Sequence, residues 1–449
     1  MLKDKKVIVV GLAKSGVSAI ALLHHLGAKI TCTDIKDETQ LGDLVDEVKP
    51  FVASAFYGYH PDDVSSYDLA VISPGIPLDI PFVKNLKNNG IEIIGEVELA
   101  YRFSKGQFVG ITGTNGKTTT TALTGMIFDL SGKKAFTVGN IGVPVASKAL
   151  ESDERTTFVT ELSSFQLETI VDFKAHIAAI LNLTPDHLNR HKTMAGYSEA
   201  KMRIFENQTA ADFLILNFDD LETREMGAHA KGRKLYFSRV NVEIEGAFIE
   251  SGWIRIRFDG SIVDICEVKD MKIFGSHNEE NALAASLICY LAGIDVTTIA
   301  LGLKTFAGVE HRIEFTAEIS GVKYYNDSKG TNPDSTIKAI QAMTAKTYLI
   351  AGGYDKKSEF APMFDVFGDT IKHLILLGAT KEILKREALN HGFEQITCVN
   401  SMEEAVAFAH KNALSGEVVL LSPACASWDM YDNFEQRGEH FKKCVLELK

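Results

Sequence analysis

A glycine-rich turn followed by a lysine and two threonines is the strongest chemical signal in the chain. It reads Gly113-Thr114-Asn115-Gly116-Lys117-Thr118-Thr119, between an apolar run and a helix-like run over 120–130. Glycines let the backbone wrap a phosphate, and a helix that starts there presents its N–H groups. Lys117 would reach the β- and γ-phosphates of a nucleotide, and the Thr118 hydroxyl would bind Mg²⁺. Ile111 replaces the first glycine of the strict Walker pattern, so the loop is a variant, and a chance glycine-rich turn is the alternative.

Two further residues at predicted strand ends have the chemistry of metal ligands. Glu161 ends the strand-like run that begins at residue 156, and His187 follows the strand-like run 177–182. Phosphoryl transfer at such a loop needs metal ligands nearby, and the carboxyl ends of parallel strands meet at one edge of a sheet. Glu161 and His187 are therefore candidate Mg²⁺ ligands. The alternatives are a carboxylate that only faces solvent and a loop histidine with a structural role.

Lys201 is a less obvious candidate. It lies in a helix-like stretch in which Tyr197, Ile204, Phe205 and Gln208 share its face by helical spacing. A buried amine favours its neutral form, and a neutral amine reacts with carbon dioxide to give a carbamate, which would be a metal ligand. The residues alone favour the alternative, a lysine that buries only its stem and keeps its charge in solvent.

A second phosphate-binding pattern lies near the N-terminus. Gly11-Leu12-Ala13-Lys14-Ser15-Gly16 follows a strand-like run and opens a helix, and Asp34 ends the next strand. This is a dinucleotide fingerprint with alanine at the second glycine, so it predicts a pyrophosphate-bearing nucleotide of some kind. Ser73-Pro74-Gly75 ends another strand and would line the same crevice. A purely structural turn is the alternative.

Three polar turns follow strands in the last third of the chain, at 326–333, 352–357 and 422–429. We expect them to surround one crevice at one edge of a sheet. In the first turn Asn332 is predicted to cap a helix that begins at Pro333. In the third turn the preceding strand is again predicted to lead directly into a helix.

Three residues of these turns have their own predictions. A helix start beside Lys329 and Thr331 would suit a carboxylate ligand. Cys425 has no His–Asp partner pattern, so it is predicted as a small buried side chain and not as a nucleophile.

Short β-branched runs alternate with helix-like stretches along almost the whole chain, which predicts an α/β protein with parallel sheets. We expect a Rossmann-like N-terminal domain over 1–105, a central ATPase domain of the phosphate-loop type over 106–312, and a Rossmann-like C-terminal domain over 313–449. Residues 234–274 break the alternation and are predicted as a small antiparallel insertion. The predicted strands are 7–10, 29–34, 51–57, 69–73, 108–112, 134–138, 157–161, 177–182, 322–326, 347–351, 373–377 and 417–421. The predicted helices include 16–26, 96–103, 195–208 and 278–292.

Composition excludes several classes of function. The chain has 449 residues, enough for about three domains. It carries 47 Lys plus Arg against 59 Asp plus Glu, a net charge of −12, which argues against nucleic acids and anionic membranes as partners. The six cysteines form no C-x-x-C pair, and no run approaches the ~18–20 apolar residues of a membrane span. We expect a cytoplasmic soluble protein.

Together these motifs resemble those of the ATP-dependent Mur ligases of peptidoglycan synthesis, and the resemblance covers all three predicted domains. The N-terminal loop and the segment 421–434 are similar to those of the member that adds D-glutamate. The Asp-Asn-Pro-Arg signature of the diaminopimelate-adding relative is absent from the sequence. Besides the loop at 112–119, the resemblance rests on Gly139-Asn140-Ile141-Gly142, the segment 161–166, Asp186-His187, Lys201, His277-Asn278 with Asn281, His311-Arg312, and Asp327-Ser328-Lys329.

The resemblance implies an amide ligase that adds D-glutamate to UDP-N-acetylmuramoyl-L-alanine through an acyl phosphate. It implies ATP, two Mg²⁺ ions and a carbamylated Lys201, and we expect a monomer. The implied metal ligands are Thr118, Glu161, His187 and Lys201. The implied ATP contacts are the loop 113–119 with Lys117, and Asn281, Arg312, Asp327 and Lys329. The implied contacts with the other substrates are Lys14, Ser15, Asp34, Ser73, Gly75, Asn140 and Gln166, and for D-glutamate Thr331, Lys356, Ser422 and Phe434.

Other functions account for fewer of these residues. A folylpolyglutamate synthetase has a similar loop and also attaches glutamate, but would not need the N-terminal uridine-nucleotide domain. An NAD-dependent dehydrogenase would leave Glu161, His187 and Lys201 without a role. A regulatory GTPase would carry an Asn-Lys-x-Asp motif, which the sequence lacks. A non-catalytic binding module leaves the number of catalytic-type positions unexplained.

Overall fold

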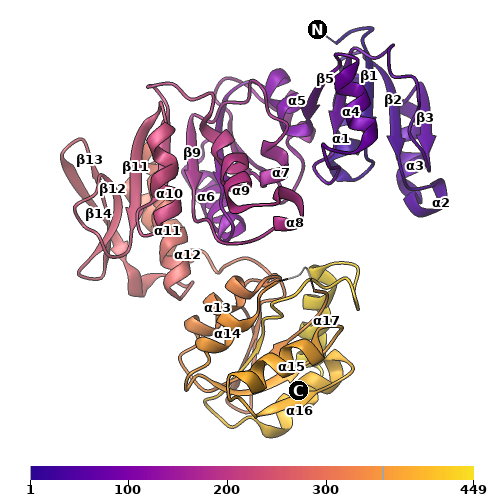
Figure 1. Ribbon diagram of the computed structural model, residues 1–449. Coiled ribbons are helices and arrows are strands. Elements are labelled where there is room, and N and C mark those ends of the chain that lie inside the picture. Colours follow the sequence, from indigo (N-terminus) through magenta and orange to yellow (C-terminus); the bar gives the residue numbers. More distant parts are fainter. Residues whose placement is uncertain (1, 356–357, 449) are drawn as a thin grey trace. The chain divides into compact units, whose positions relative to one another are not determined.

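Three α/β sheets follow one another along the chain in the computed structural model, which describes residues 2–355 and 358–448 (Figure 1). The chain divides into two compact units. Unit 1 comprises Met1–Asp270 with Glu280–Lys304 and holds the first two sheets; unit 2 comprises Met271–Glu279 with Thr305–Lys449 and holds the third. No helix within the described ranges is long and apolar enough to cross a membrane.

The first sheet is fully parallel, in the order β3-β2-β1-β4-β5. Successive side chains of a strand point to opposite faces, so the apolar run of β1 fills two cores. Val7 and Val9 pack with α1, and Ile8 and Val10 pack with α4. The strands are β1 Lys6–Val10, β2 Lys29–Asp34, β3 Ser54–Tyr57, β4 Leu69–Ile72 and β5 Glu92–Gly95. The helices are α1 Lys14–His25, α2 Glu38–Leu41, α3 Asp43–Val48, α4 Pro81–Asn88 and α5 Glu96–Phe103.

The second sheet has nine strands in the order β14-β13-β12-β11-β10-β9-β6-β8-β7. Its strands are β6 Gln107–Thr112, β7 Ala135–Gly139, β8 Thr157–Glu161, β9 Ile177–Ile180, β10 Phe213–Asn217, β11 Arg233–Ser238, β12 Gly246–Glu250, β13 Trp253–Phe258 and β14 Ser261–Glu267. Its helices are α6 Lys117–Ser131, α7 Ser164–Leu167, α8 Leu188–His191, α9 Met194–Met202, α10 Leu221–Met226, α11 Ser276–Leu291 and α12 Val296–Thr305.

The predicted antiparallel insertion at 234–274 is only partly correct. The strands β12, β13 and β14 pair antiparallel, but they extend the central sheet. The strand β11 pairs parallel with both β10 and β12. In β11 the buried Leu235 and Phe237 alternate with half-buried or exposed residues. This pattern is typical of an antiparallel strand with one solvent-exposed face, which explains why the sequence predicted an antiparallel segment.

The third sheet has the order β15-β16-β20-β17-β18-β19, and only β15 is antiparallel to its neighbour. Its strands are β15 Glu314–Ile319, β16 Val322–Asn326, β17 Thr347–Ala351, β18 Ile371–Leu376, β19 Ile396–Cys398 and β20 Val418–Leu421. Its helices are α13 Pro333–Ala342, α14 Ala361–Asp365, α15 Lys381–Asn390, α16 Met402–Asn412 and α17 Phe434–Leu446.

The predicted start of α13 is confirmed, because the Asn332 side chain accepts from the Ser335 N–H and Pro333 is the first helical residue. The prediction that 421–429 runs directly into a helix is wrong. The strand β20 ends at Leu421, and α17 begins only at Phe434. The intervening loop is held by Arg437, whose buried guanidinium donates to the carbonyls of Cys425 and Ala426.

Two other predicted elements are shorter than expected. Residues 49–51 form a 3₁₀ helix, so β3 begins at Ser54 and not at residue 51. The predicted helix 195–208 ends at Met202 and continues as the 3₁₀ turn Arg203–Phe205.

A buried carboxyl group lies where α5 packs against the 3₁₀ helix Val145–Ser147. One carboxylate oxygen of Glu96 accepts from the Ala146 N–H. The other, Oε2, has no hydrogen-bond partner within the described part of the chain. Burial raises the pKa of Glu96 to about 7.

Replacing Glu96 by Gln is expected to stabilise the protein, and the gain should grow with pH. Between pH 4.5 and about 7 the unfolded carboxyl ionises while the folded one stays protonated, so stability falls as pH rises. A pKa difference of this size corresponds to about 3 kcal/mol above pH 7. Thermal unfolding of Glu96→Gln and wild type across pH 4–8 measures the difference. Exposed Glu47→Gln is the control, and a gain independent of pH would contradict the assignment.

Candidate functional site

The phosphate-type loop connects β6 to α6, at the carboxyl edge of the second sheet. The helix α6 begins at Lys117, so its positive end lies at the loop. Asn182, just after the neighbouring β9, fixes the loop's path. Its side-chain oxygen accepts from the N–H groups of Thr114 at 3.1 Å and Asn115 at 2.8 Å. The sequence predicts a strand that ends at residue 182, but only the pairing of β6 with β9 places Asn182 against the loop.

The predicted residue Asn281 lies against this loop. Gly116 has φ +82°, and a Cβ there would lie 2.3 Å from the Asn281 side-chain oxygen. The same oxygen accepts from the Thr120 hydroxyl at 3.2 Å. Asn281 is buried on α11 and lies 161 positions after Thr120 in the sequence. A residue distant in sequence therefore packs against the loop.

Two lysines converge on one carbonyl of the loop. Lys117 Nζ donates to the carbonyls of Gly113 at 2.8 Å and Thr114 at 2.7 Å. Lys201 Nζ donates to the same Gly113 carbonyl at 2.7 Å and lies 4.6 Å from the centre of the Tyr197 ring. Lys201 is only 1% exposed, so the alternative of a lysine with its charge in solvent is wrong.

The environment of Lys201 favours a neutral amine. Burial, and next the charge of Lys117, lower the pKa of Lys201 well below its ordinary value. Asp186 and Glu161 act in the opposite direction, which places both carboxylates within electrostatic reach of the amine. Asp186 was not among the predicted site residues, although the motif Asp186-His187 is one of those on which the family resemblance rests.

Glu161, at the end of β8, offers an unused ligand atom. Its Oε1 accepts from the Asn140 side-chain amide at 2.7 Å, so these two predicted residues do meet. Its Oε2 is buried and lacks a hydrogen-bond partner in the described ranges. A buried carboxylate oxygen in this state is costly unless a cation or donor satisfies it. The site therefore fits a bound cation beside Glu161.

Two other predicted metal ligands, Thr118 and His187, follow neighbouring parallel strands and so lie at the same edge of the second sheet. Thr118 is buried in the first turn of α6. His187 precedes α8 with φ +55°, and its ring lies 4.9 Å from the ring of Phe165. The segment before it is tied to the loop, because the Thr114 hydroxyl donates to the Thr184 carbonyl at 3.0 Å. Hydroxyl, carboxylate and imidazole groups thus belong to one sheet edge.

The N-terminal loop is also a close-packed turn. A Cβ on Gly16 would lie 2.1 Å from the Gly11 carbonyl, so only glycine fits where the loop meets α1. The Ser73 hydroxyl donates to that carbonyl at 2.7 Å. Asp34 accepts from the Leu12 N–H at 2.7 Å and from the Lys36 N–H at 2.9 Å. Each carboxylate oxygen of Asp34 thus accepts a hydrogen bond from a backbone N–H group.

The remaining predicted residues of unit 1 differ in exposure. Lys14 is exposed and Ser15 half-buried at the start of α1, and a Cβ on Gly75 would meet open space. Gln166 is buried and forms a reciprocal capping box with Ser163, a structural role that the sequence did not reveal.

Arg190 on α8 joins the two sheets of unit 1. It donates to the Ile76 carbonyl at 3.0 Å and pairs with Glu168. It therefore connects the turn after β4 with the segment that carries His187. Nothing in the local sequence pattern identified it.

In unit 2 the three predicted turns follow β16, β17 and β20, and the described parts of these turns share one edge because β20 pairs in parallel with both other strands. Ser422 donates to the buried Asp327 at 2.7 Å. Burial raises the pKa of Asp327 to about 6, although Arg312 and Ser422 act to lower it. Arg312 Nε is buried without a hydrogen-bond partner in the parts of the chain described.

The other predicted residues of unit 2 lie around the same edge. Lys329 Nζ lies 5.2 Å from the centre of the Phe434 ring, and Thr331 is half-buried. Lys356 lies outside the described residues. Cys425 is 2% exposed, and burial raises its pKa to about 12, so the prediction of a small buried side chain is confirmed.

Comparison with known families matches three models along the chain. Residues 5–95 match the MurD-like N-terminal domain of Mur ligases, residues 111–289 the Mur ligase middle domain, and residues 311–425 the Mur ligase glutamate ligase domain.

Curated relatives match over the whole chain. The sequence is 49% identical over 451 residues to the UDP-N-acetylmuramoylalanine–D-glutamate ligase of Alkaliphilus metalliredigens, covering 100% of this chain and 99% of the relative. It is 49% identical over 450 residues to the ligase of the same name from Clostridioides difficile, covering 100% of both.

Solved structures share the fold at lower identity. The UDP-N-acetylmuramate–alanine ligase MurC of Thermotoga maritima has a TM-score of 0.62 at 18% identity, covering 99% of this chain and 100% of that one. The MurF ligase of Thermotoga maritima, solved in complex with ADP, has a TM-score of 0.61 at 16% identity, covering 100% and 99%.

Proposed function

Since the chain belongs to the Mur ligase family, we propose that it joins D-glutamate to UDP-N-acetylmuramoyl-L-alanine at the expense of ATP. The observation that carries the proposal is the loop at 113–117, where two lysines meet one carbonyl beside Glu161. It stands in a chain that is 49% identical over its full length to ligases of that name. We also propose that the protein works in the cytoplasm, where both nucleotide substrates would be available. We propose that it is a monomer.

The proposed reaction has two steps. The carboxylate of the terminal L-alanine attacks the γ-phosphorus of ATP, which gives an acyl phosphate and ADP. The amine of D-glutamate, after losing its proton, attacks the acyl carbon, and inorganic phosphate leaves as the amide forms. Lys117 offsets the negative charge that builds up when one anion attacks another, and the start of α6 adds N–H groups.

We propose that Thr118 and Glu161 hold one Mg²⁺ ion, and that His187 and carbamylated Lys201 hold a second. Two observations support this assignment: Glu161 Oε2 has no hydrogen-bond partner in the described ranges, and burial lowers the pKa of Lys201, which favours its neutral amine. When bound, the ions would neutralise phosphate charge and orient the phosphate oxygens. In the chain itself, Asn182 fixes the path of the loop that would hold the phosphates, and Asn281 lies against it.

The proposed domains are 1–105, 106–312 and 313–449, with the uridine diphosphate in the first, ATP mainly in the second and D-glutamate in the third. Lys14, Ser15, Ser73 and Gly75 are proposed to bind the uridine diphosphate, with Asn140 and Gln166 near the muramoyl peptide. The proposed ATP residues beyond the loop are Asn281, Arg312, Asp327 and Lys329. The proposed D-glutamate residues are Thr331, Lys356, Ser422 and Phe434.

Asp34 is proposed to act by shaping the N-terminal loop. Removing its carboxylate in Asp34→Ala releases the Leu12 N–H and the Lys36 N–H. Hydrogen bonds to a charged group contribute about 1.5–3 kcal/mol, so we expect KM for the nucleotide-sugar to rise at least tenfold. KM for ATP should stay within twofold. Steady-state kinetics against exposed Asp46→Ala as control measure both, and an equal rise in both KM values would contradict the role.

Phosphate release from ATP and Mg²⁺ tests the proposed function. The substrate UDP-N-acetylmuramoyl-L-alanine is supplied with D-glutamate, with L-glutamate or with no amino acid. Release that requires both the nucleotide-sugar and D-glutamate supports the proposal. Release that follows L-glutamate with a folate would favour the folate ligase instead. No release in any mixture would overturn the assignment.

A further inference from the structure

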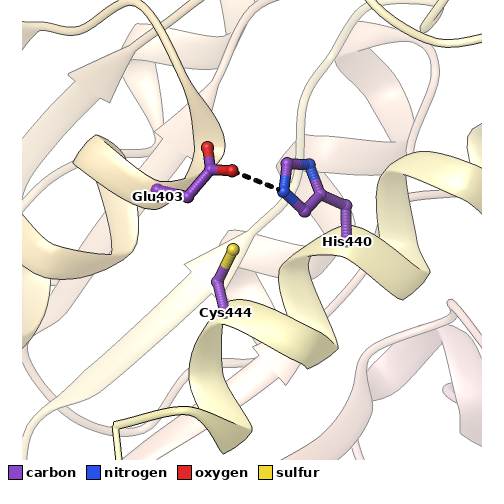
Figure 2. Close-up of side chains that lie close together, drawn as sticks. All are labelled: Glu403, His440 and Cys444. Atoms are coloured by element: carbon purple, nitrogen blue, oxygen red, sulfur yellow. Dashed lines mark hydrogen bonds and ion pairs between the residues drawn. The ribbon is translucent and has the colours of Figure 1, made fainter.

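Three side chains of the types that commonly bind transition metals lie close together on the helices α16 and α17 of unit 2. Figure 2 shows Glu403, His440 and Cys444 pointing toward one another. Glu403 Oε1 lies 2.9 Å from His440 Nε2, and the carboxylate, imidazole and thiol ligand atoms all lie within 4.8 Å of one another. None of the three is among the residues proposed to bind ATP, the nucleotide-sugar or D-glutamate.

The positions of these side chains are fixed by packed helices. His440 and Cys444 are four residues apart on α17, so they occupy the same face of that helix. Glu403 lies in the first turn of α16, next to the buried Met402. Met402 and the α17 residue Phe441 belong to one core cluster, which holds the two helices together. Ligands on rigid elements lose little freedom when they bind an ion.

The ring of His440 is already oriented. Its Nδ1 lies 2.9 Å from the Tyr431 hydroxyl, which leaves Nε2 facing Glu403. Histidine ligands of metals usually hold their second nitrogen in a hydrogen bond of this kind, because it sets the ring and the tautomer. Tyr431 therefore supplies the outer contact that a metal site would need.

We propose that Glu403, His440 and Cys444 bind one divalent transition-metal ion, with Zn²⁺ as the best match, and that water completes a tetrahedral shell. Zinc accepts thiolate sulfur, imidazole nitrogen and carboxylate oxygen, whereas Mg²⁺ and Ca²⁺ prefer oxygen alone. Tetrahedral bonds of zinc place such atoms roughly 3.3–3.6 Å apart, a small side-chain adjustment from the present arrangement.

Binding has a simple atom balance. The Cys444 S–H proton passes to buffer as the Zn–S bond forms. His440 Nε2 also gives up the proton that it shares with Glu403, and the neutral ring keeps its one proton on Nδ1, against the Tyr431 hydroxyl. One bond from His440 Nε2 and one from Glu403 to the ion then replace the contact between these two side chains. The Glu403 side chain is 60% exposed and that of His440 31%, so an ion can enter from solvent. Cys444 is buried, so the bound sulfur would be shielded.

A second cluster in unit 2 has a different character. Glu310, His311 and Glu439 also lie close together. Lys442 pairs with Glu310, with Glu439 at 2.8 Å and with Glu314 at 3.3 Å. An ammonium group already neutralises these carboxylates, so this cluster needs no metal ion.

Titration of the full-length protein with Co²⁺ as a substitute for Zn²⁺ tests the proposal. A thiolate ligand gives an intense charge-transfer band in the near ultraviolet, which the oxygen and nitrogen ligands proposed for the ATP site cannot produce. We expect one Co²⁺ per chain with this band and displacement of Co²⁺ by Zn²⁺. Failure of the ATP-dependent activity would not affect this readout, so the two proposals are tested separately.

Variants locate the site. Cys444→Ser should abolish the band, whereas Ser at the exposed Cys398 should leave it unchanged. Glu403→Gln and His440→Gln should each weaken Co²⁺ binding at least tenfold, and Tyr431→Phe about tenfold. Glu403 is at the surface, so its variant remains informative if Cys444→Ser folds poorly. Absence of the band in the wild type, its persistence in Cys444→Ser, or full affinity in both Gln variants would overturn the proposal.

Discussion

Replacing Lys117 by Ala is expected to lower kcat by roughly 10³-fold, because a preorganised charge at the transferring phosphate contributes several kcal/mol in a dry site. The Lys117 amine already lies at the loop, with hydrogen bonds of 2.8 Å and 2.7 Å to the carbonyls of Gly113 and Thr114. A phosphate entering the loop would exchange these contacts for charged ones. The loss should therefore appear in kcat as well as in KM for ATP.

Two variants separate charge from loop structure. Lys117→Arg retains the charge on a longer, planar group, so it should recover only part of the activity. Exposed Lys133→Ala, just after α6, is the matched control and should be unaffected. Circular dichroism and thermal unfolding verify folding. Wild-type kcat in Lys117→Ala would exclude phosphate transfer at this loop.

Replacing Lys201 by Ala should lower turnover on the order of 100-fold, and added formate or acetate should restore part of it. Lys201 is 1% exposed, and burial lowers its pKa well below the ordinary lysine value, which favours the neutral amine that reacts with carbon dioxide. A free carboxylate fits the space left by the side chain and supplies the oxygen ligand of the lost carbamate. Wild-type activity should in turn fall in buffer depleted of bicarbonate.

Labelled carbon dioxide gives a second readout for Lys201. A carbamate carbon signal in the NMR spectrum of wild-type protein should be missing from Lys201→Ala and present in exposed Lys231→Ala. Unimpaired turnover of Lys201→Ala at low bicarbonate would contradict the carbamate. So would a loss of activity that no carboxylic acid repairs, in a variant that unfolds at the wild-type temperature.

The sequence predicted strands and helix caps correctly where they depend on residues close together in the chain. The apolar runs of β1 and β6, and the cap of α13 by Asn332, follow from local propensity and spacing. The strands β5 and β10 were not predicted. The strand β5 carries only two apolar residues before Gly95, and β10 has an apolar run of four residues before Asn217 that does not distinguish strand from helix.

The contacts that complete the sites come from residues distant in sequence, so no local pattern reveals them. Asn182 braces the phosphate-type loop through the pairing of β6 with β9, and Arg437 organises the loop after β20 from α17. Lys201 illustrates the limit most clearly. Helical spacing places it on an apolar face, but only the packed fold determines that its amine ends inside the protein at Gly113.

The most direct test of the account follows oxygen through the reaction. UDP-N-acetylmuramoyl-L-alanine labelled with ¹⁸O in its terminal carboxylate is turned over with ATP, Mg²⁺ and D-glutamate, and the inorganic phosphate is analysed by mass. Transfer of the γ-phosphoryl group to that carboxylate predicts one ¹⁸O atom in each phosphate, because the acyl carbon–oxygen bond breaks when the amine attacks. Unlabelled phosphate would mean that water, not the substrate carboxylate, accepts the phosphoryl group, and would contradict the proposed ligase chemistry.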